Sequence, residues 1–252
     1  MTIRELLYQT YRGIQRRIAP TLRYSQSLYE DTLRACVTPQ TRWLDLGCGH
    51  QILPPWRLAA EQELTAGLPI LAGLDGDLGS LRHHKTVRLR VLGHLETLPF
   101  RAGSFNLVTA NMVLEHLATP DTCLQEVSRV LAPGGLFLCH TPNVWGYPTV
   151  LGRLVPDAVK GPLIRTLDGR EEHDVFKTHY HANSGRILRQ LARTAGLRVE
   201  RIRMIATSAV LAMIPPLALV ELVWIRVLLT KPFAAIRPDI IALFRKPASP
   251  DA

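Results

Sequence analysis

The sequence lacks paired cysteines and any common metal-binding spacing. Its four cysteines, Cys36, Cys48, Cys123 and Cys139, are scattered and form no CxxC pair. This excludes a disulfide framework and argues against a zinc site, so we expect no bound metal. A reducing compartment such as the cytoplasm fits this cysteine usage best.

A secretory signal and the marks of a nucleic-acid-binding module are missing as well. The first twenty residues carry arginines but no unbroken apolar segment or small-residue cleavage site, so we expect them to stay in the mature protein. Zinc-finger spacing, an RNA-binding aromatic signature and a dense basic run are all absent, and no nucleic acid is expected as a partner. The formal net charge of +9 still favours something anionic, such as lipid or a phosphorylated substrate.

Strand-like and helical patterns alternate after Pro39. Apolar runs typical of strands occupy residues 42–46, 69–74, 87–92, 105–110, 135–140, 197–205 and 240–244. Most of the intervals between them have helical periodicity, which predicts an α/β fold with a mainly parallel sheet and helices on both faces. We expect one domain over residues 39–252, preceded by a helical segment over residues 1–38.

Within the first segment, apolar residues recur at helical spacing over residues 3–18, while arginines occupy much of the remaining surface. This predicts a basic amphipathic helix. Such a helix either packs on the flank of the domain or lies in a membrane interface.

Two insertions interrupt the alternation. Residues 142–182 are rich in proline, glycine, aromatics and histidine, which is typical of a lid over a ligand. Residues 206–231 contain an apolar stretch that Pro215, Glu221 and Arg226 make unsuitable for crossing a bilayer. A broken helical hairpin is predicted there, which covers a ligand pocket or dips into an anionic membrane surface; burial against the core or a second subunit is the alternative.

The stretch WLDLGCGHQILPPW contains a glycine loop directly after the first strand. Gly47 and Gly49 bring the backbone close to a ligand, but Ile52 stands where a dinucleotide fingerprint has its third glycine. Asp45 would repel a phosphate and attract a cation, so the loop favours a positively charged ligand such as a sulfonium. Asp75, at the end of the next strand, can bind both hydroxyls of a ribose or, like Asp77, cap a helix.

Six motifs follow one another in the chain, within a resemblance that covers residues 40–205: LDLGCG, GLD, GHLETLPF, SFNLV, VLEHL and RVLAPGGLF. This ordered set resembles the class I S-adenosylmethionine-dependent methyltransferases. VLEHL together with HTPN is most similar to the branch that methylates quinones and other small or lipid-like acceptors. The resemblance implies a Rossmann-like, seven-stranded sheet with an antiparallel last strand at RPDIIALFRKP, and S-adenosylmethionine as cofactor.

The resemblance also implies roles for individual residues. The expected cofactor-binding residues are Asp45, Gly47 and Gly49 at the methionine end, Asp75 and Gly76 at the ribose, His94 and Leu95 at the adenine, and Asn111 and Met112 at the adenosyl group. His94 departs from the family, which commonly has Asp at this position, so it either contacts the adenine or is an exposed loop histidine. Asn106 replaces the Asp of SFDLV, a change expected to affect loop anchoring rather than chemistry.

His116 of VLEHL resembles the family's histidine on the acceptor side. It is the candidate catalytic base if the acceptor is a hydroxyl, and the alternative is that it anchors the start of a helix. Glu115 either orients it or bonds to backbone. The expected acceptor-binding residues in the lid are Tyr147, His173, Phe176, His179 and Tyr180.

Together these patterns predict an enzyme that transfers a methyl group from S-adenosylmethionine to a small or lipid-like acceptor, most readily at oxygen. We expect it in the cytoplasm, with peripheral association at a membrane. The departures at His94 and Asn106 leave a non-catalytic binding module open, and a nucleotide-dependent oxidoreductase on a similar sheet is the third alternative.

Overall fold

The computed structural model describes residues 3–154, 177–207, 211 and 214–248, with side chains from residue 6 onward. The chain divides into two compact units, and each is described here by itself. The helical unit contains Met1–Ser27, Pro142–Lys177 and Met204–Asp239, and the sheet unit contains Leu28–Thr141, Thr178–Arg203 and Ile240–Ala252.

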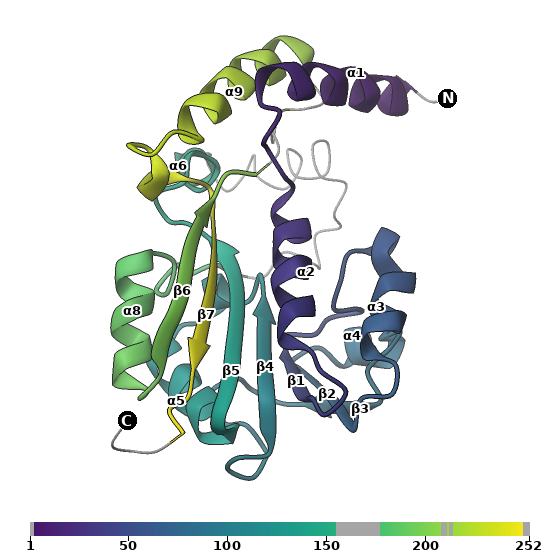
Figure 1. Cartoon of the computed structure of the whole chain (residues 1–252), viewed down its shortest axis with the longest axis vertical. Coiled ribbons are helices and arrows are strands. Elements are labelled where there is room, and N and C mark those ends of the chain that lie inside the picture. Colours follow the sequence, from purple (N-terminus) through teal and green to yellow (C-terminus); the bar gives the residue numbers. More distant parts are fainter. Residues whose placement is uncertain (1–2, 155–176, 208–210, 212–213, 249–252) are drawn as a thin grey trace. The chain divides into compact units, whose positions relative to one another are not determined.

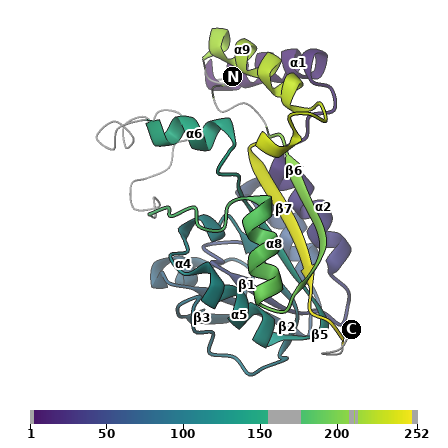
Figure 2. The same ribbon diagram turned by 90° about the vertical axis from the view of Figure 1, so that its left-hand side faces the viewer.

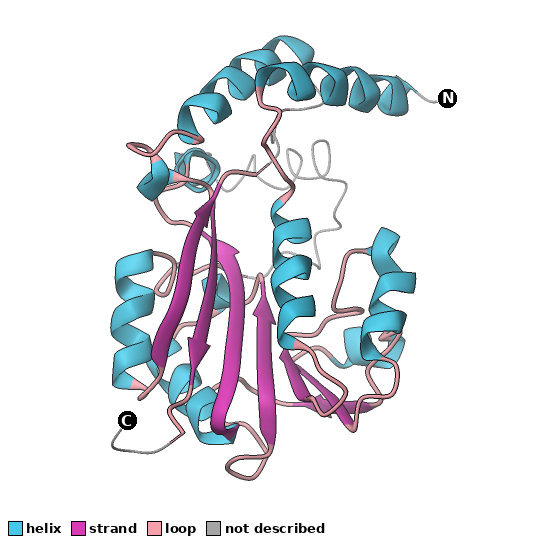
Figure 3. Ribbon diagram, in the orientation of Figure 1, coloured by secondary structure: helices cyan, strands magenta, loops and turns pink. Residues whose placement is uncertain are grey.

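The elements of the described chain are shown in Figures 1 and 3. The helices are α1 Ile3–Ile18, α2 Ser25–Cys36, α3 Leu58–Thr65, α4 Leu78–His83, α5 Pro120–Val130, α6 Tyr147–Leu154, α8 Gly185–Thr194 and α9 Pro215–Leu228. The strands are β1 Arg42–Leu46, β2 Ile70–Asp75, β3 Leu89–Leu92, β4 Phe105–Asn111, β5 Leu131–Pro142, β6 Arg198–Ile205 and β7 Asp239–Arg245. Short 3-10 helices occupy Pro55–Arg57 (η1), Leu114–His116 (η2) and Ala234–Ile236 (η4).

The seven strands form one sheet in the order β3-β2-β1-β4-β5-β7-β6. The strands from β3 to β5 are parallel to their neighbours, with Asp45 of β1 opposite Gly73 of β2 and Thr109 of β4. The last strand, β7, runs in the opposite direction (Figure 1). The predicted seven-stranded, mainly parallel sheet with an antiparallel last strand is therefore confirmed.

Helices cover both faces of this sheet, so its central strands are buried on both sides. Four of the five residues of β1 are buried, as expected for a strand in the middle of a parallel sheet. Helix α5 packs against α8 on one face, and α2 lies on the other (Figure 2). Helix α8 begins after Ser184, whose hydroxyl accepts a hydrogen bond from the Ile187 amide and so caps the helix.

Strand β5 is longer than the predicted strand over residues 135–140. It includes Pro133, Gly134 and Gly135, because the preceding helix α5 already ends at Val130. Gly134 has a φ of +78° and its amide donates to the Lys246 carbonyl at 2.9 Å. Glycine provides this left-handed turn while the segment continues in the sheet.

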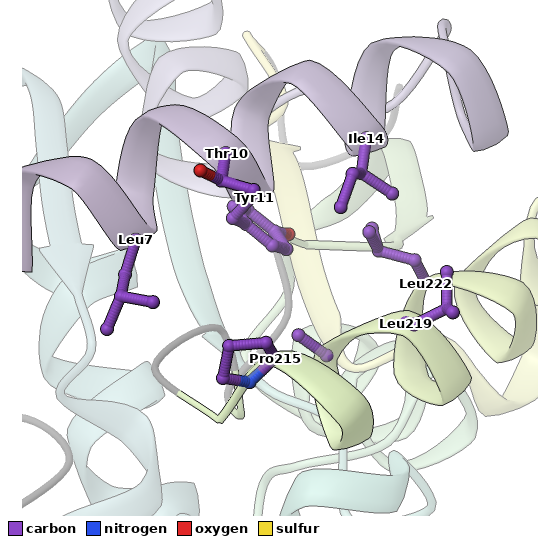
Figure 4. Close-up of a pocket in the computed structure, with 8 residues that line it drawn as sticks. Leu7, Thr10, Tyr11, Ile14, Pro215, Leu219 and Leu222 are labelled. Carbon is purple, nitrogen blue, oxygen red and sulfur yellow. The ribbon is translucent and has the colours of Figure 1, made fainter.

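In the helical unit, α1 packs on α9 (Figure 4). The apolar stripe of α1 presents Leu7, Tyr11 and Ile14 to α9, where they meet Pro215 and Leu222 around a shallow groove. Tyr11 and Leu222 belong to a buried cluster that also includes Ala218 and Ile225 of α9. The predicted amphipathic helix over residues 3–18 therefore buries its apolar face within the protein.

The predicted broken helical hairpin over 206–231 is described only in part. Its described part contains one helix, α9, in which Pro215 occupies the first helical position. Proline is tolerated there because the amide it lacks has no partner inside the helix, so the prolines begin the helix instead of breaking it. The segment before it falls mostly on residues 208–210 and 212–213, outside the described residues. No helix in the described part of the chain is both long and apolar enough to cross a membrane.

Candidate functional site

The glycine loop after β1 lies at the carboxyl edge of the sheet. Gly47 and Gly49 have left-handed φ angles of +60° and +52°, a conformation that glycine adopts without strain. A Cβ atom on Gly47 would lie 2.6 Å from Cγ2 of Val113. The Gly47 amide donates to the Leu74 carbonyl at 2.8 Å, which ties the loop to the end of β2. The loop backbone is thereby fixed at the edge where open α/β folds bind cofactors.

Ile52, in place of a third glycine, anchors the loop to the core. Ile52 and Leu53 are both buried, and the Leu53 amide donates to Oε2 of Glu61 at 2.8 Å. The other carboxylate oxygen of Glu61 accepts the Thr86 hydroxyl. Glu61 is fully buried in the first turn of α3, and nothing in the local sequence marks it as an anchor of the loop.

Asp45 lies beneath the loop with only 3% of its surface exposed. Its carboxylate accepts the hydroxyl of Thr109, which in turn accepts the indole N–H of Trp43 at 2.7 Å. Burial raises the pKa of Asp45 from 3.8 to about 7; the neighbouring carboxylates of Glu61 and Asp75 add to the rise, and the Thr109 hydrogen bond opposes it. A cation near this carboxylate would favour its ionised form.

Asp75 holds the glycine loop from the neighbouring strand. Its Oδ2 accepts the Gly49 amide at 2.8 Å and its Oδ1 accepts the Asp77 amide at 2.9 Å. Helix α4 is capped instead by Asp77, whose carboxylate accepts the amides of Gly79 and Ser80. The capping alternative therefore applies to Asp77, and Asp75 lies beside the loop glycines, where a ribose acid is expected.

The GHLETLPF segment is fixed to α5. The Leu98 amide donates to Glu126 at 2.8 Å, and Arg129 donates to the carbonyls of Leu98 and Phe100 at 2.8 and 2.7 Å. His94 is exposed at the start of this loop, and Leu95 after it is half-buried. Gly76, which follows β2, is exposed. The Gly93 amide donates to the Asp75 carbonyl at 3.1 Å, so the adenine-loop candidates begin next to the ribose candidate.

Asn111 ends β4 at the same edge, and Met112 follows it directly. Met112 has a φ of +59°, rare for a residue other than glycine, and its amide donates to the His140 carbonyl at 2.8 Å. The Asn111 side-chain oxygen lies 2.9 Å from Nδ1 of His140, whose ring stacks on Tyr29. Left-handed residues of this kind cost free energy and cluster at functional sites. Asn106, at the opposite end of β4, anchors β1 through the Arg42 amide at 2.8 Å, as expected for a structural position.

The VLEHL turn places His116 next to a buried acid. His116 is partly exposed, and its Nε2 lies 4.0 Å from Oε1 of Glu115, whose side chain is 5% exposed. Burial raises the pKa of Glu115. Its Oε2 accepts the Thr141 hydroxyl at 2.9 Å, and Thr141 accepts the Asn183 amide at 2.6 Å. This chain of hydrogen bonds orients Glu115 and was not predicted.

The described end of the insertion at 142–182, the predicted lid, returns to the same turn. The carbonyl of Glu115 accepts the amides of His179 and Tyr180 at 2.7 and 3.1 Å, and a ring nitrogen of His181 lies 2.9 Å from the Ala118 carbonyl. Tyr180 has a φ of +57°, a second left-handed residue that is not glycine. The structure thus brings His116, His179 and Tyr180 together around Glu115.

The remaining lid candidates are placed differently. Tyr147 belongs to the helical unit, where its hydroxyl donates to Oε1 of Glu221 at 2.6 Å. Burial, followed by this hydrogen bond, raises the pKa of Tyr147. His173 and Phe176 lie outside the described residues.

The cysteines contribute neither a nucleophile nor a metal ligand set. None of the four forms a disulfide bond. Burial raises the pKa of Cys123 to about 12, and it raises the pKa values of Cys48 and Cys139 even more. The thiols of Cys48, Cys123 and Cys139 therefore stay protonated. In the part of the chain that the structure describes, no group of three or more His, Cys, Asp or Glu residues is arranged to hold a metal ion.

The sequence matches the family described as "Methyltransferase domain" over residues 8–202, which is 195 of its 252 residues. The chain belongs to this family. The resemblance to class I S-adenosylmethionine-dependent methyltransferases that the motifs indicated is therefore confirmed, and the glycine loop, Asp75 and the VLEHL turn occupy the edge of a methyltransferase sheet.

Characterised relatives share parts of this methyltransferase sequence. A fatty-acid O-methyltransferase of Mycolicibacterium smegmatis is 35% identical over 119 residues, covering 46% of this chain and 42% of the relative. A ubiquinone/menaquinone biosynthesis C-methyltransferase of Rubrivivax gelatinosus is 32% identical over 108 residues, 42% of each protein. The chain spans less than half the length of the curated relatives it matches.

Solved structures share the fold. An S-adenosylmethionine-dependent methyltransferase from Mesorhizobium loti superposes with a TM-score of 0.54 at 17% identity, covering 85% of this chain and 96% of that one. At this identity the similarity extends to the arrangement of the sheet and helices and no further.

Proposed function

We propose that this methyltransferase-family chain transfers a methyl group from S-adenosylmethionine to a small or lipid-like acceptor, most readily at oxygen. The observation that carries the proposal is the pairing of the left-handed glycine loop with the Asp75 carboxylate at one edge of the sheet, above the buried Asp45. This arrangement suits a ligand that combines a ribose with a cationic sulfur centre.

The residues present fit that cofactor. Gly47 lets the loop backbone pass close to Val113, where a Cβ atom would collide, and its left-handed conformation keeps the loop at the carboxyl edge of the sheet. Asp45 would face the cationic end, Asp75 with Gly76 would hold the ribose, and Asn111 and Met112 would contact the adenosyl group. His94 and Leu95 are proposed to meet the adenine. The bound cofactor supplies an electrophilic methyl group, which is transferred by in-line displacement.

The proposed acceptor lies beside the VLEHL turn. His116 is assigned as the base that takes a hydroxyl proton, because it is partly exposed and next to the oriented carboxylate of Glu115. His179 and Tyr180, which are hydrogen-bonded to the same turn, are assigned to acceptor binding. Tyr147, His173 and Phe176 are proposed for the same role. Residues 142–182 and 206–231 are proposed to be the insertions that bind the acceptor. Both belong to a methyltransferase domain proposed over residues 39–252, which follows the helical segment 1–38.

The lipid-like acceptor is supported by the names of two relatives, one of which acts on fatty acids and the other in quinone biosynthesis. Their names give oxygen and carbon, respectively, as the methylated atom. We assign the chain to the cytoplasm, with peripheral association at a membrane where such acceptors reside.

The test combines binding and turnover. Titration calorimetry should detect S-adenosylmethionine and no NAD binding, and labelled methyl groups should reach a fatty acid or a quinol in a panel that also includes small phenols. Asp75→Asn is the matched variant, which should weaken cofactor binding because an amide accepts fewer ribose hydrogen bonds. Absence of binding at millimolar cofactor would overturn the proposal in favour of a binding module.

A further inference from the structure

Helix α9 is apolar around most of its circumference. Its inner side, with Ala218, Leu222 and Ile225, is buried against α1. Its outer side is exposed: Val220 is 67% accessible and Val223 is 52% accessible. Other large apolar side chains of this helix that remain exposed are Leu217, Leu219 and Trp224. A helix that stays apolar on its exposed side presents a surface suited to a non-aqueous partner.

The only acid of α9 is withdrawn from that surface. Glu221 is 6% exposed; it accepts the Tyr147 hydroxyl at 2.6 Å and the Leu211 amide at 2.7 Å. Its charge is therefore held inside the helical unit, and the outer side of α9 carries no negative charge. The arrangement leaves the apolar residues without an acidic neighbour on the same helix.

Every exposed charge that the structure describes in the helical unit is positive. Within residues 6–27, 142–154, 177, 204–207, 211 and 214–239, the two acids, Glu221 and Asp239, are both buried. The exposed cations are Arg12, Arg16, Arg17, Arg23, Arg153, Lys177, Arg226 and Lys231. A surface that combines exposed apolar side chains with cations and no exposed acid is complementary to an anionic lipid headgroup layer.

Packing explains how α1 contributes its charges. Because Tyr11 and Ile14 face α9, the arginines Arg12, Arg16 and Arg17 remain on the exposed side of α1. Arg226 of α9 donates to the Ile18 carbonyl at 2.7 Å and so fastens the end of α1 to α9. The two helices therefore act as one element that carries both the apolar and the basic side chains.

We propose that α1 and α9 form a docking surface for an anionic lipid bilayer, with α9 lying in the headgroup interface. The proposal rests on the proposed function and deepens it by naming the surface that brings the enzyme to a lipid-like acceptor. Helix α9 has 14 residues and is about 21 Å long, shorter than the roughly 30 Å hydrocarbon core, so its length suits an interfacial position. A second copy of the chain is disfavoured as the occupant because its cations would repel these cations.

The experiment is co-sedimentation of the full chain with vesicles of phosphatidylcholine alone or mixed with phosphatidylglycerol. Binding is expected only to the anionic vesicles, and it should decrease with salt. Replacing all three of Arg12, Arg16 and Arg17 by Gln should weaken binding about 100-fold. The charge-matched control, with Gln at Arg186, Arg193 and Arg198 of the sheet unit, should leave binding within about twofold.

A second variant addresses the apolar side. Val220→Asp should weaken binding by about tenfold or more, whereas Val199→Asp on β6 should have little effect. Brominated lipids should quench the emission of the wild-type chain more than that of Trp224→Phe. Equal binding to neutral and anionic vesicles, or unchanged binding of both the triple-arginine and Val220→Asp variants, would overturn the proposal.

Two further readouts separate other outcomes. A dimer in solution that Val220→Asp dissociates would assign the surface to a second copy and overturn the proposal. Cofactor calorimetry on every variant checks folding of the sheet unit. A chain that binds vesicles as predicted but no S-adenosylmethionine would contradict the proposed function while supporting the docking surface.

Discussion

Asp45 and Thr109 face each other across the parallel pair β1 and β4, and the Thr109 hydroxyl donates to the Asp45 carboxylate beneath the glycine loop. Both side chains are almost completely buried. The hydrogen bond only partly offsets the cost of burying a charge, so the pKa of Asp45 stays at about 7. The protonation of this residue therefore changes close to neutral pH.

Cofactor binding should depend on that protonation. A cationic ligand favours ionised Asp45, so the affinity for S-adenosylmethionine should rise with pH up to about 7 and level off above it. Below pH 7 the affinity is expected to fall up to about tenfold per pH unit. Titration calorimetry from pH 5.5 to 8.5 measures this. The product S-adenosylhomocysteine, whose sulfur is neutral, should show a weaker dependence; identical profiles for the two ligands would contradict the role of Asp45.

Asp45→Asn should separate binding from stability. The pKa of Asp45 is higher in the folded chain than in the unfolded chain. Between pH 3.8 and about 7, the folded chain therefore holds a proton at Asp45 that the unfolded chain has released. The free energy of unfolding consequently falls as the pH rises through this range. Above pH 7 the ionised carboxylate costs up to roughly 4 kcal/mol, which a neutral amide avoids. The variant should unfold about 5 °C or more above the wild type at pH 8 and bind cofactor poorly. Glu63→Gln, at an exposed acid, is the control, and a lower unfolding temperature for Asp45→Asn would refute the argument.

Gly47→Ala should damage the loop more than Gly49→Ala. Both glycines are left-handed, which costs about 1–2 kcal/mol for alanine, but only the Cβ at residue 47 would collide with Val113, at 2.6 Å. We expect Gly47→Ala to lower both the unfolding temperature and the cofactor affinity, and Val113→Ala in that background to restore part of each. Gly152→Ala in α6, where no atom lies within 4 Å, serves as the control. Equal losses for the two loop variants would show that the contact with Val113 is unimportant.

His116→Ala should reduce turnover while leaving cofactor affinity within about twofold. A positioned base contributes about 100-fold or more to proton transfer, and His116 lies next to the carboxylate that Thr141 orients. Glu115→Gln keeps the shape of the side chain and removes its charge, so a smaller loss, about tenfold, is expected. His83→Ala, at an exposed histidine of α4, is the matched control. Full activity of His116→Ala would make this residue structural.

The order of motifs in the sequence was sufficient to predict the sheet, because strands alternating with helices leave few parallel arrangements. Asp75 was singled out because it ends a strand at the carboxyl edge of the sheet, whereas Met112 was singled out by the family resemblance alone. Glu61 was missed because its partners, Leu53 and Thr86, come from other segments and its local pattern is that of an ordinary surface helix. Thr109 would have been easier to find from the sequence, because it is a polar residue inside an apolar strand. Such a residue needs a hydrogen-bond partner from a neighbouring strand.

The insertion before the last strand shows a different limit. Its apolar stretch predicted a helix, but Pro215 was interpreted as a break, although the first position of a helix is equally compatible with proline. The pairing of α9 with α1 joins segments about two hundred residues apart, and neither pattern alone specifies its partner. The amphipathic pattern predicted which side of α1 is buried, but it did not predict that α9 covers that side.

Tyr147→Phe should distinguish the roles of the ring and of the hydroxyl. The hydroxyl donates to buried Glu221 at 2.6 Å, so its removal leaves the carboxylate with one fewer donor and should cost about 1–3 kcal/mol in stability. Because the ring is retained, the KM for the acceptor should change less than twofold, whereas Tyr147→Ala should raise it if the ring contacts the acceptor. Glu221→Gln removes the charge that needs the donor, so Tyr147→Phe should cost less in that background. Thermal unfolding of the four members of this double-mutant cycle measures the coupling, and strictly additive effects would show that the hydrogen bond contributes nothing to holding α6 against α9.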